Sequence, residues 1–194
     1  MQDEELLERQ EMLQREARAV VERLRLFETL AGAGRVVPLG SAVTGLMVWR
    51  DLDFGVGGSG LTGEAAWETV RPLLARCSAL RYLDDRDERR HYYVMQIDGW
   101  KVDLSLWCDG VPPPVEWFQA DLVARLDDEL RLTILRLKDA WHAQPAYPEV
   151  VGAWEIYDAV LHHDVRTLAG LDAYLAARGL PTHDRGDGPV PAGD

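Results

Sequence analysis

Hydrophobic residues near the start of the chain recur at three- and four-residue steps. This stripe of an amphipathic helix runs over residues 3–31 and ends before Gly32 and Gly34. Its members are Leu6, Leu13, Ala17, Val20, Leu24 and Phe27. The pattern predicts one helix with a buried apolar face. That face either packs on the rest of the chain or forms the coiled-coil seam of a homodimer, and the shortness of the seam favours the first.

The middle of the chain changes to runs of alternating apolar and polar residues, which are typical of strands. Strands are predicted at residues 35–39, 51–56, 81–83, 91–97 and 100–107. Asp98-Gly99 is a strong hairpin signal, so the last two strands should be antiparallel neighbours. Between the second and third strands, residues 62–78 are predicted as a helix with Thr62 as N-cap and a kink at Pro72.

Three consecutive prolines, residues 112–114, mark the start of a helical second half. Helices are predicted over residues 116–142, 150–162 and 168–177, and the Gly-, Pro- and Asp-rich end is predicted to be a disordered tail. The fold class is therefore α+β, with a mixed sheet, flanking helices and a C-terminal helical bundle. We expect four parts: an N-terminal helix (1–33), a core (34–111), a helical substrate-side domain (112–179) and a tail (180–194).

The formal net charge of −12 bears on the kind of partner to expect. An extended nucleic-acid surface is normally basic, so a long DNA or RNA partner is disfavoured. The N-terminus lacks the basic and apolar segments of a signal peptide, and no apolar run reaches membrane-spanning length. We expect a cytoplasmic protein without a membrane partner, in which Cys77, on the predicted helix, and Cys108, at the end of a strand, are free buried thiols.

Three aspartates on two predicted strands are the chemically most informative residues. Asp51 and Asp53 share one face of their strand, and Lys101, Asp103 and Ser105 share one face of another. If the two strands are neighbours, the three carboxylates converge. Such a cluster is costly unless a cation neutralises it, and Mg²⁺, which prefers oxygen ligands, is the natural candidate.

The order of these residues resembles a known signature. Gly40-Ser41, a short spacer, Asp51-x-Asp53 and a third aspartate on a later strand are similar to the pattern of the DNA polymerase beta-type nucleotidyltransferase superfamily. The similarity covers residues 36–107. The rest of the resemblance is to small bacterial members, such as those that nucleotidylate antibiotics, and to uncharacterised relatives. The resemblance implies a nucleotidyltransferase-type mixed sheet. It also implies that Asp51, Asp53 and Asp103 are catalytic metal ligands for Mg²⁺ or Mn²⁺.

Three further residues are candidate contacts to the nucleotide. Gly40 and Ser41 begin a helical turn whose backbone N–H groups could hold the triphosphate. Lys101 either neutralises phosphate charge or is simply the ionic partner of Asp103. The arginines of the charged loop, Arg86, Arg89 and Arg90, either reach over the triphosphate or form a solvated loop that the neighbouring acidic residues compensate.

The resulting hypothesis is an enzyme that moves a nucleoside monophosphate from a nucleoside triphosphate such as ATP to a hydroxyl of a small molecule or protein. Its active site would lie in the cleft between the core and the helical half. Asp103 would also accept the proton of the attacking hydroxyl. The alternative from another class is a non-catalytic nucleotide-binding or toxin–antitoxin interaction protein with the same fold. The intact set of three carboxylates favours the enzyme.

Overall fold

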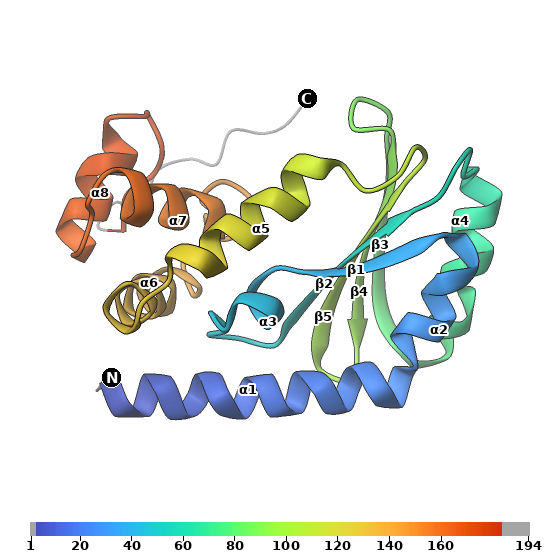
Figure 1. The fold of residues 1–194 in the computed structure, drawn as a ribbon, viewed down its shortest axis with the longest axis horizontal. Coiled ribbons are helices and arrows are strands. Elements are labelled where there is room, and N and C mark those ends of the chain that lie inside the picture. The colour runs from blue at the N-terminus through green and yellow to red at the C-terminus, as the bar shows by residue number, and fades with distance from the viewer. Residues whose placement is uncertain (1–2, 184–194) are drawn as a thin grey trace. The chain divides into compact units, whose positions relative to one another are not determined.

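The computed structural model describes residues 3–183, and the chain divides into two compact units (Figure 1). The sheet unit comprises residues 10–123. The helical unit comprises residues 3–9 and 124–183 of the described chain. Most of the predicted tail, residues 184–194, lies outside the described residues.

Five strands form one mixed sheet in the order β1-β2-β5-β4-β3, which agrees with the expected fold class. Their bounds are β1 Arg35–Leu39, β2 Asp51–Gly57, β3 Cys77–Asp85, β4 Arg90–Ile97 and β5 Trp100–Trp107. Strands β2 and β5 are parallel, whereas the other neighbouring pairs are antiparallel. The turn between β4 and β5 is the predicted Asp98-Gly99 pair, and both residues have positive φ (52° and 80°). The topology therefore makes β2 and β5 direct neighbours.

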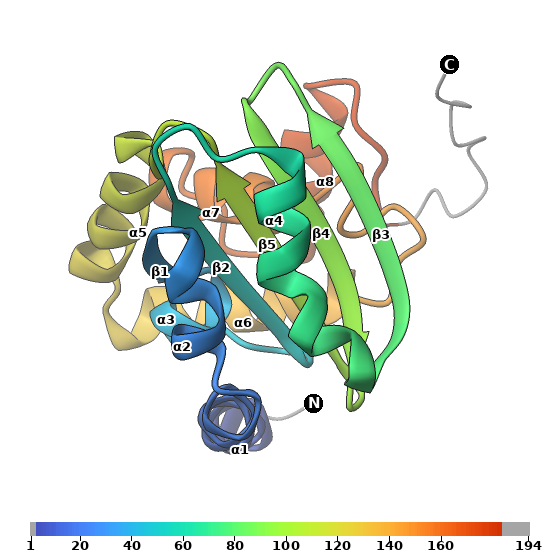
Figure 2. The same ribbon diagram turned by 90° about the vertical axis from the view of Figure 1, so that its right-hand side faces the viewer.

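The two faces of the sheet differ in chemistry. One face is apolar and forms the core with α2 (Leu26–Leu30) and α4 (Gly63–Val70), which cover it in Figure 2. Its strand residues include Leu52, Phe54, Val56, Tyr93, Met95, Val102, Leu104 and Leu106, all buried. Because successive strand residues alternate between faces, the residues between them on β2, β4 and β5 lie on the opposite face. That opposite face carries the candidate site.

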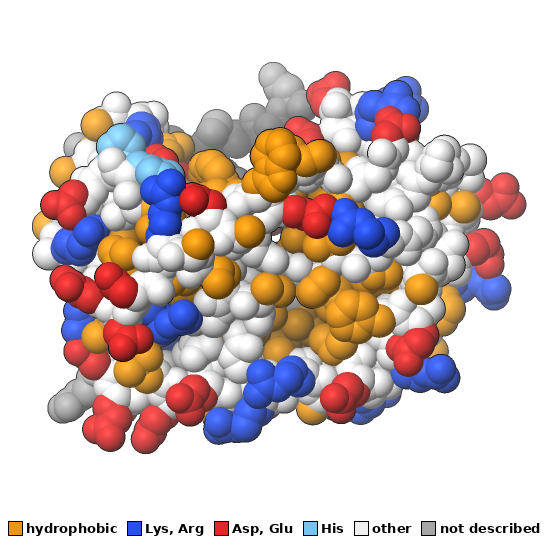
Figure 3. Space-filling model, in the orientation of Figure 1, with side chains coloured by type: hydrophobic (Ala, Val, Ile, Leu, Met, Phe, Trp, Pro, Cys, Tyr) orange, Lys and Arg blue, Asp and Glu red, His pale blue; other side chains and the backbone are white. Residues whose placement is uncertain are grey.

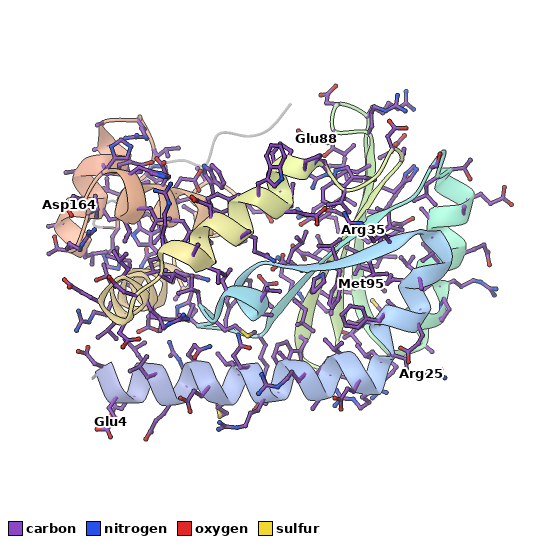
Figure 4. All side chains as sticks on the ribbon, in the orientation of Figure 1. Glu4, Arg25, Arg35, Glu88, Met95 and Asp164 are labelled. Carbon is purple, nitrogen blue, oxygen red and sulfur yellow. The ribbon has the colours of Figure 1, made fainter. Side chains whose placement is uncertain are left out.

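The N-terminal helix ends earlier than predicted. Helix α1 spans Asp3–Leu24, and Arg25 then adopts a left-handed conformation (φ 49°, ψ 47°) before α2 begins; Figure 4 labels this residue at the end of α1. The break changes the helical phase, so Leu26 and Leu30 are fully buried while Phe27 is 45% exposed. The prediction of a continuous helix with Phe27 on its buried face is therefore wrong. The other five residues of the stripe are buried.

The predicted helix over residues 62–78 is also shorter. Thr62 caps α4 as expected, since its hydroxyl accepts a hydrogen bond from the Ala65 amide (3.2 Å). After α4 the chain continues as a 3-10 helix, Arg71–Arg76, with Pro72 at its start. Proline cannot donate the hydrogen bond that an α-helix requires. Cys77 consequently lies on β3, and both it and Cys108 are partly exposed free thiols, which corrects the prediction of buried ones.

Helix α5 (Pro113–Arg125) covers the free edge of β1 within the sheet unit. Gln119 donates a hydrogen bond through Nε2 to the Pro38 carbonyl (3.2 Å), and Glu116 forms an ion pair with Arg35. These contacts occupy an edge that would otherwise offer unpaired backbone groups.

The helical unit contains α6 (Asp128–Trp141), α7 (Ala153–His162) and α8 (Leu168–Ala176). The prediction of one helix over residues 116–142 is wrong, because Asp127 is extended and caps α6 by accepting a hydrogen bond from the Leu130 amide (2.8 Å). Among residues 3–183, no helix combines the length and apolar character needed to cross a bilayer.

Candidate active site

The three aspartates meet on the polar face of the sheet. In the parallel register of β2 and β5, Asp53 lies opposite Asp103 and Asp51 lies opposite Lys101. The carboxylate oxygens that Asp51, Asp53 and Asp103 offer lie within 4.8 Å of one another. The convergence predicted from strand alternation is therefore confirmed, and the role of these residues as metal ligands stays a prediction.

Lys101 lies among these carboxylates. Its Nζ is 2.7 Å from Oδ2 of Asp103, 3.5 Å from Oδ1 of Asp51 and 5.4 Å from the centre of the Trp49 ring. Burial disfavours the ammonium charge, but the nearby carboxylates outweigh it and raise the pKa of Lys101 above its usual value. The structure thus shows Lys101 as the ionic partner of Asp103, and a contact to phosphate stays a prediction.

Tyr92 on β4 is a site residue that the sequence analysis missed. Its hydroxyl donates a hydrogen bond to Oδ2 of Asp103 (2.7 Å), and burial and the adjacent carboxylate raise its pKa above the usual tyrosine value. The Asp98-Gly99 turn contained the signal for it, because a two-residue hairpin fixes the register of β4 against β5. Counting back from the turn places Tyr92 opposite Ser105, on the same face as Asp103.

The two oxygens of the Asp103 carboxylate have different surroundings. Oδ2 accepts hydrogen bonds from both Tyr92 and Lys101, whereas Oδ1 is buried and lacks a hydrogen-bond partner among residues 3–183. An unpaired buried carboxylate oxygen is costly. A hard divalent cation takes carboxylate oxygens as ligands, so the donor set around Oδ1 fits Mg²⁺ or Mn²⁺.

The Gly-Ser segment lies directly against this cluster. Gly40 has φ 71°, and a Cβ added there would lie 2.0 Å from Oδ2 of Asp53. Only glycine permits both this conformation and this close approach. Ser41, which is buried, then begins the single turn of α3 (Ser41–Thr44), and the Gly40 carbonyl accepts hydrogen bonds from the amides of Val43 and Thr44 (3.2 Å each). Gly40 and Ser41 therefore adjoin the carboxylates, and their contact to a triphosphate stays a prediction.

Comparison with known proteins rests on structure alone, because no family model and no curated protein matches the sequence. Among solved structures, a variant of the Cid1 poly(U) polymerase bound to MgATP is similar over 79% of this chain and 51% of its own, with a TM-score of 0.59 and 16% identity. The same enzyme bound to MgGTP matches over 78% of this chain and 50% of its own, with a TM-score of 0.58 and 16% identity. A cytoplasmic RNA terminal U-transferase matches 77% of this chain and 46% of its own, with a TM-score of 0.55 and 17% identity.

The chain has a nucleotidyltransferase fold. The solved neighbours are a poly(U) polymerase and an RNA terminal U-transferase, and this chain spans about half of their length. At 16–17% identity the similarity establishes the fold.

The arginines of the β3–β4 turn in this nucleotidyltransferase fold have acidic partners. The ion pairs are Arg86–Asp84 (3.1 Å), Arg89–Asp109 (2.5 Å) and Arg90–Asp85 (2.9 Å). The pairing favours the interpretation of a compensated, solvated loop for Arg86 and Arg89, which are mostly exposed. Arg90 differs, because its Nη1 also donates a hydrogen bond to Oγ of Ser105 (3.0 Å) on the site face.

A groove of about 520 Å³ lies beside β1 and α3 in the sheet unit. Its walls are mostly apolar and include Val21, Phe27, Leu52 and Phe54. Leu52 and Phe54 lie on the apolar face of β2, so the groove opens on the side of the sheet opposite the carboxylates. Hydrophobic side chains gather between α1 and β1 on the surface shown in Figure 3. The volume lies in the range of small-ligand sites.

Proposed function

We propose that the protein is a metal-dependent nucleotidyltransferase that moves a nucleoside monophosphate from a nucleoside triphosphate to a hydroxyl group. The observation that carries this proposal is the meeting of Asp51, Asp53 and Asp103 on one sheet face, with Oδ1 of Asp103 buried and unpaired among the described residues. The nucleotidyltransferase fold of the chain supports it.

Each site residue has a definite task in this proposal. Asp51, Asp53 and Asp103 hold Mg²⁺ or Mn²⁺, and the backbone of Gly40 and Ser41 faces the triphosphate. A bound divalent ion would offset phosphate charge and lower the pKa of the attacking hydroxyl. In the transfer, a bond forms between the acceptor oxygen and the α-phosphorus, and the bond to pyrophosphate breaks. The acceptor's proton passes to the Asp103 carboxylate.

The proposed acceptor is a small molecule or a protein. The net charge of −12 supports this choice, because an extended nucleic-acid partner requires a basic surface. On the surface drawn in Figure 3, basic side chains stand among acidic ones. We further propose that the protein is of the small bacterial type that nucleotidylates antibiotics and that it is located in the cytoplasm.

A second candidate is terminal nucleotide addition to RNA. The solved neighbours favour it, since they are a poly(U) polymerase and an RNA terminal U-transferase. The two candidates share the carboxylate site and differ in the acceptor. A non-catalytic nucleotide-binding protein is the remaining alternative, and the retention of all three carboxylates argues against it.

The experiment is a transfer assay with four nucleoside triphosphates, each labelled at the α-phosphate. Each is incubated with the protein, Mg²⁺ and a fractionated cell extract, and label is followed in small molecules, proteins and RNA. The proposal expects label in small molecules or in proteins, and only when Mg²⁺ is present. Label only in RNA would support the second candidate. Absence of label in every fraction, with nucleotide binding retained, would support the non-catalytic alternative.

A further inference from the structure

Lys101 occupies a position in the carboxylate cluster that suits a cation. Its ammonium lies 2.7 Å from Asp103 and 3.5 Å from Asp51, and its side chain is only 13% exposed. The sheet fixes this position, because Lys101 on β5 is the cross-strand neighbour of Asp51 on β2. The ammonium also lies over the Trp49 ring, 5.4 Å from its centre, within the range of a cation–π interaction.

The charges of the cluster determine how many further cations it needs. The three carboxylates carry a formal charge of −3, and Lys101 reduces the sum for these four side chains to −2. One divalent ion neutralises that remainder. Two divalent ions about 4 Å apart, the arrangement of two-metal sites, would place one of them where it repels an ammonium that is already in contact with two of the ligands.

The two carboxylate oxygens of Asp103 also differ in what is left for them to bind. Lys101 and Tyr92 both donate to Oδ2 of Asp103, so that oxygen is already satisfied. Oδ1 has no hydrogen-bond partner in the described chain and remains for an ion. Asp103 therefore has one oxygen directed to the built-in ammonium and one oxygen left to ligate a metal.

We propose that Lys101 takes the place of one of two cations, so that the resting site binds a single divalent ion. Lys101 is then a positioning residue, which acts through the carboxylates and sets the metal stoichiometry. This inference rests on the proposed metal site, and it goes further by fixing the number of ions and the residue responsible.

The test counts Mn²⁺ ions on the full-length protein without nucleotide, by the loss of the free Mn²⁺ electron paramagnetic resonance signal during titration. Wild type should bind one ion. Lys101→Met removes the ammonium and keeps a chain of similar length, and it should bind two ions, the first at least tenfold more tightly than wild type does. The pair should show a spin-coupled spectrum that wild type lacks.

Two further variants serve as a substitute and as a control. Lys101→Gln keeps a hydrogen-bond donor for Asp103, and it should also bind two ions if Lys101→Met does not fold. Arg90→Met removes a cation that contacts Ser105 on the same face, and it should still bind one ion.

The outcomes separate this inference from the proposed function. Two ions on wild type, or one ion on a folded Lys101→Met or Lys101→Gln protein, would overturn the role of Lys101 and leave the metal site standing. No ion on wild type would overturn both the inference and the metal-dependent function.

Discussion

Asp53 on β2 lies directly opposite Asp103 on β5 in the parallel register of the sheet. The two residues are 50 positions apart in the chain, and the pairing of their strands brings a third carboxylate, Asp51, within 4.8 Å of both. Like charges so close together favour a state in which a cation is bound.

The first prediction concerns the close approach of Gly40 to Asp53. In Gly40→Ala the new methyl group would lie 2.0 Å from Oδ2 of Asp53, so the carboxylate or the turn has to move. We expect Mn²⁺ affinity and nucleotidyl transfer to fall by at least a hundredfold, about 2.7 kcal/mol in each free energy. Titration with Mn²⁺ and the transfer assay measure the two losses.

Gly60→Ala is the matched control for backbone strain. Gly60 has a similarly positive φ of 67°, but a Cβ there meets no atom within 4 Å. This variant should lose stability and keep metal binding. Equal loss of metal binding in both variants would show that strain, rather than contact with Asp53, is responsible.

The second prediction concerns the hydrogen bond from Tyr92 to Asp103. In Tyr92→Phe, Oδ2 of Asp103 keeps Lys101 as a donor and loses the phenol. We expect a transfer rate lower by about tenfold, or about 1.4 kcal/mol, with the fold retained. The assay should show the change mainly in kcat if Tyr92 orients Asp103 for the reaction.

Tyr93→Phe provides the comparison, because Tyr93 points to the opposite, apolar face of the sheet, where burial raises its pKa to about 12. Removal of the Tyr93 hydroxyl should leave kcat unchanged. A larger loss of kcat in Tyr93→Phe than in Tyr92→Phe would contradict the role given to Tyr92.

Residues 51–53 and 101–105 show how far the sequence can predict the site. Period-two alternation assigned each of these side chains to the correct face, because a strand permits only two faces. The parallel pairing of β2 with β5 depends on contacts between distant parts of the chain, and the local pattern does not contain it. The sequence analysis therefore stated the pairing only as a condition, and the family resemblance implied only that the three aspartates share a site.

The helix boundaries show where local patterns were insufficient. The apolar stripe continues to Phe27, yet the chain breaks at Arg25 and buries Leu26 instead. Likewise a continuous helical pattern hides the break at Asp127, where a side-chain cap begins a new helix. At Arg25 tertiary packing outweighs helix propensity, whereas at Asp127 a local side-chain cap sets the boundary.

The third prediction concerns the packing of α1. Leu13 belongs to the core cluster and is 4% exposed, whereas its neighbour Met12 is 41% exposed. Leu13→Ala should lower the free energy of unfolding by about 2–5 kcal/mol, because it leaves a cavity. Met12→Ala should change it by less than about 0.5 kcal/mol. Urea denaturation measures the free energy of unfolding of both variants. Similar losses in the two variants would show that α1 packs loosely.

The fourth prediction concerns nucleic acids. With a net charge of −12, the protein should bind duplex DNA and structured RNA only weakly and without sequence preference at physiological salt. Fluorescence anisotropy over a salt series measures this directly. Selective binding below micromolar concentration would instead favour RNA as the acceptor.

The central claim is that the three carboxylates form a metal site for nucleotidyl transfer, and Asp53→Asn tests it most directly. The measurement follows label from the α-phosphate into acceptors in the extract, for wild type and variant, with and without Mg²⁺. The account predicts transfer only by wild type and only with Mg²⁺. It also predicts that the variant unfolds at the same or a slightly higher temperature than metal-free wild type, because one repelling carboxylate is gone. Transfer by a well-folded Asp53→Asn protein at the wild-type rate, or wild-type transfer that persists without divalent ions, would contradict the account.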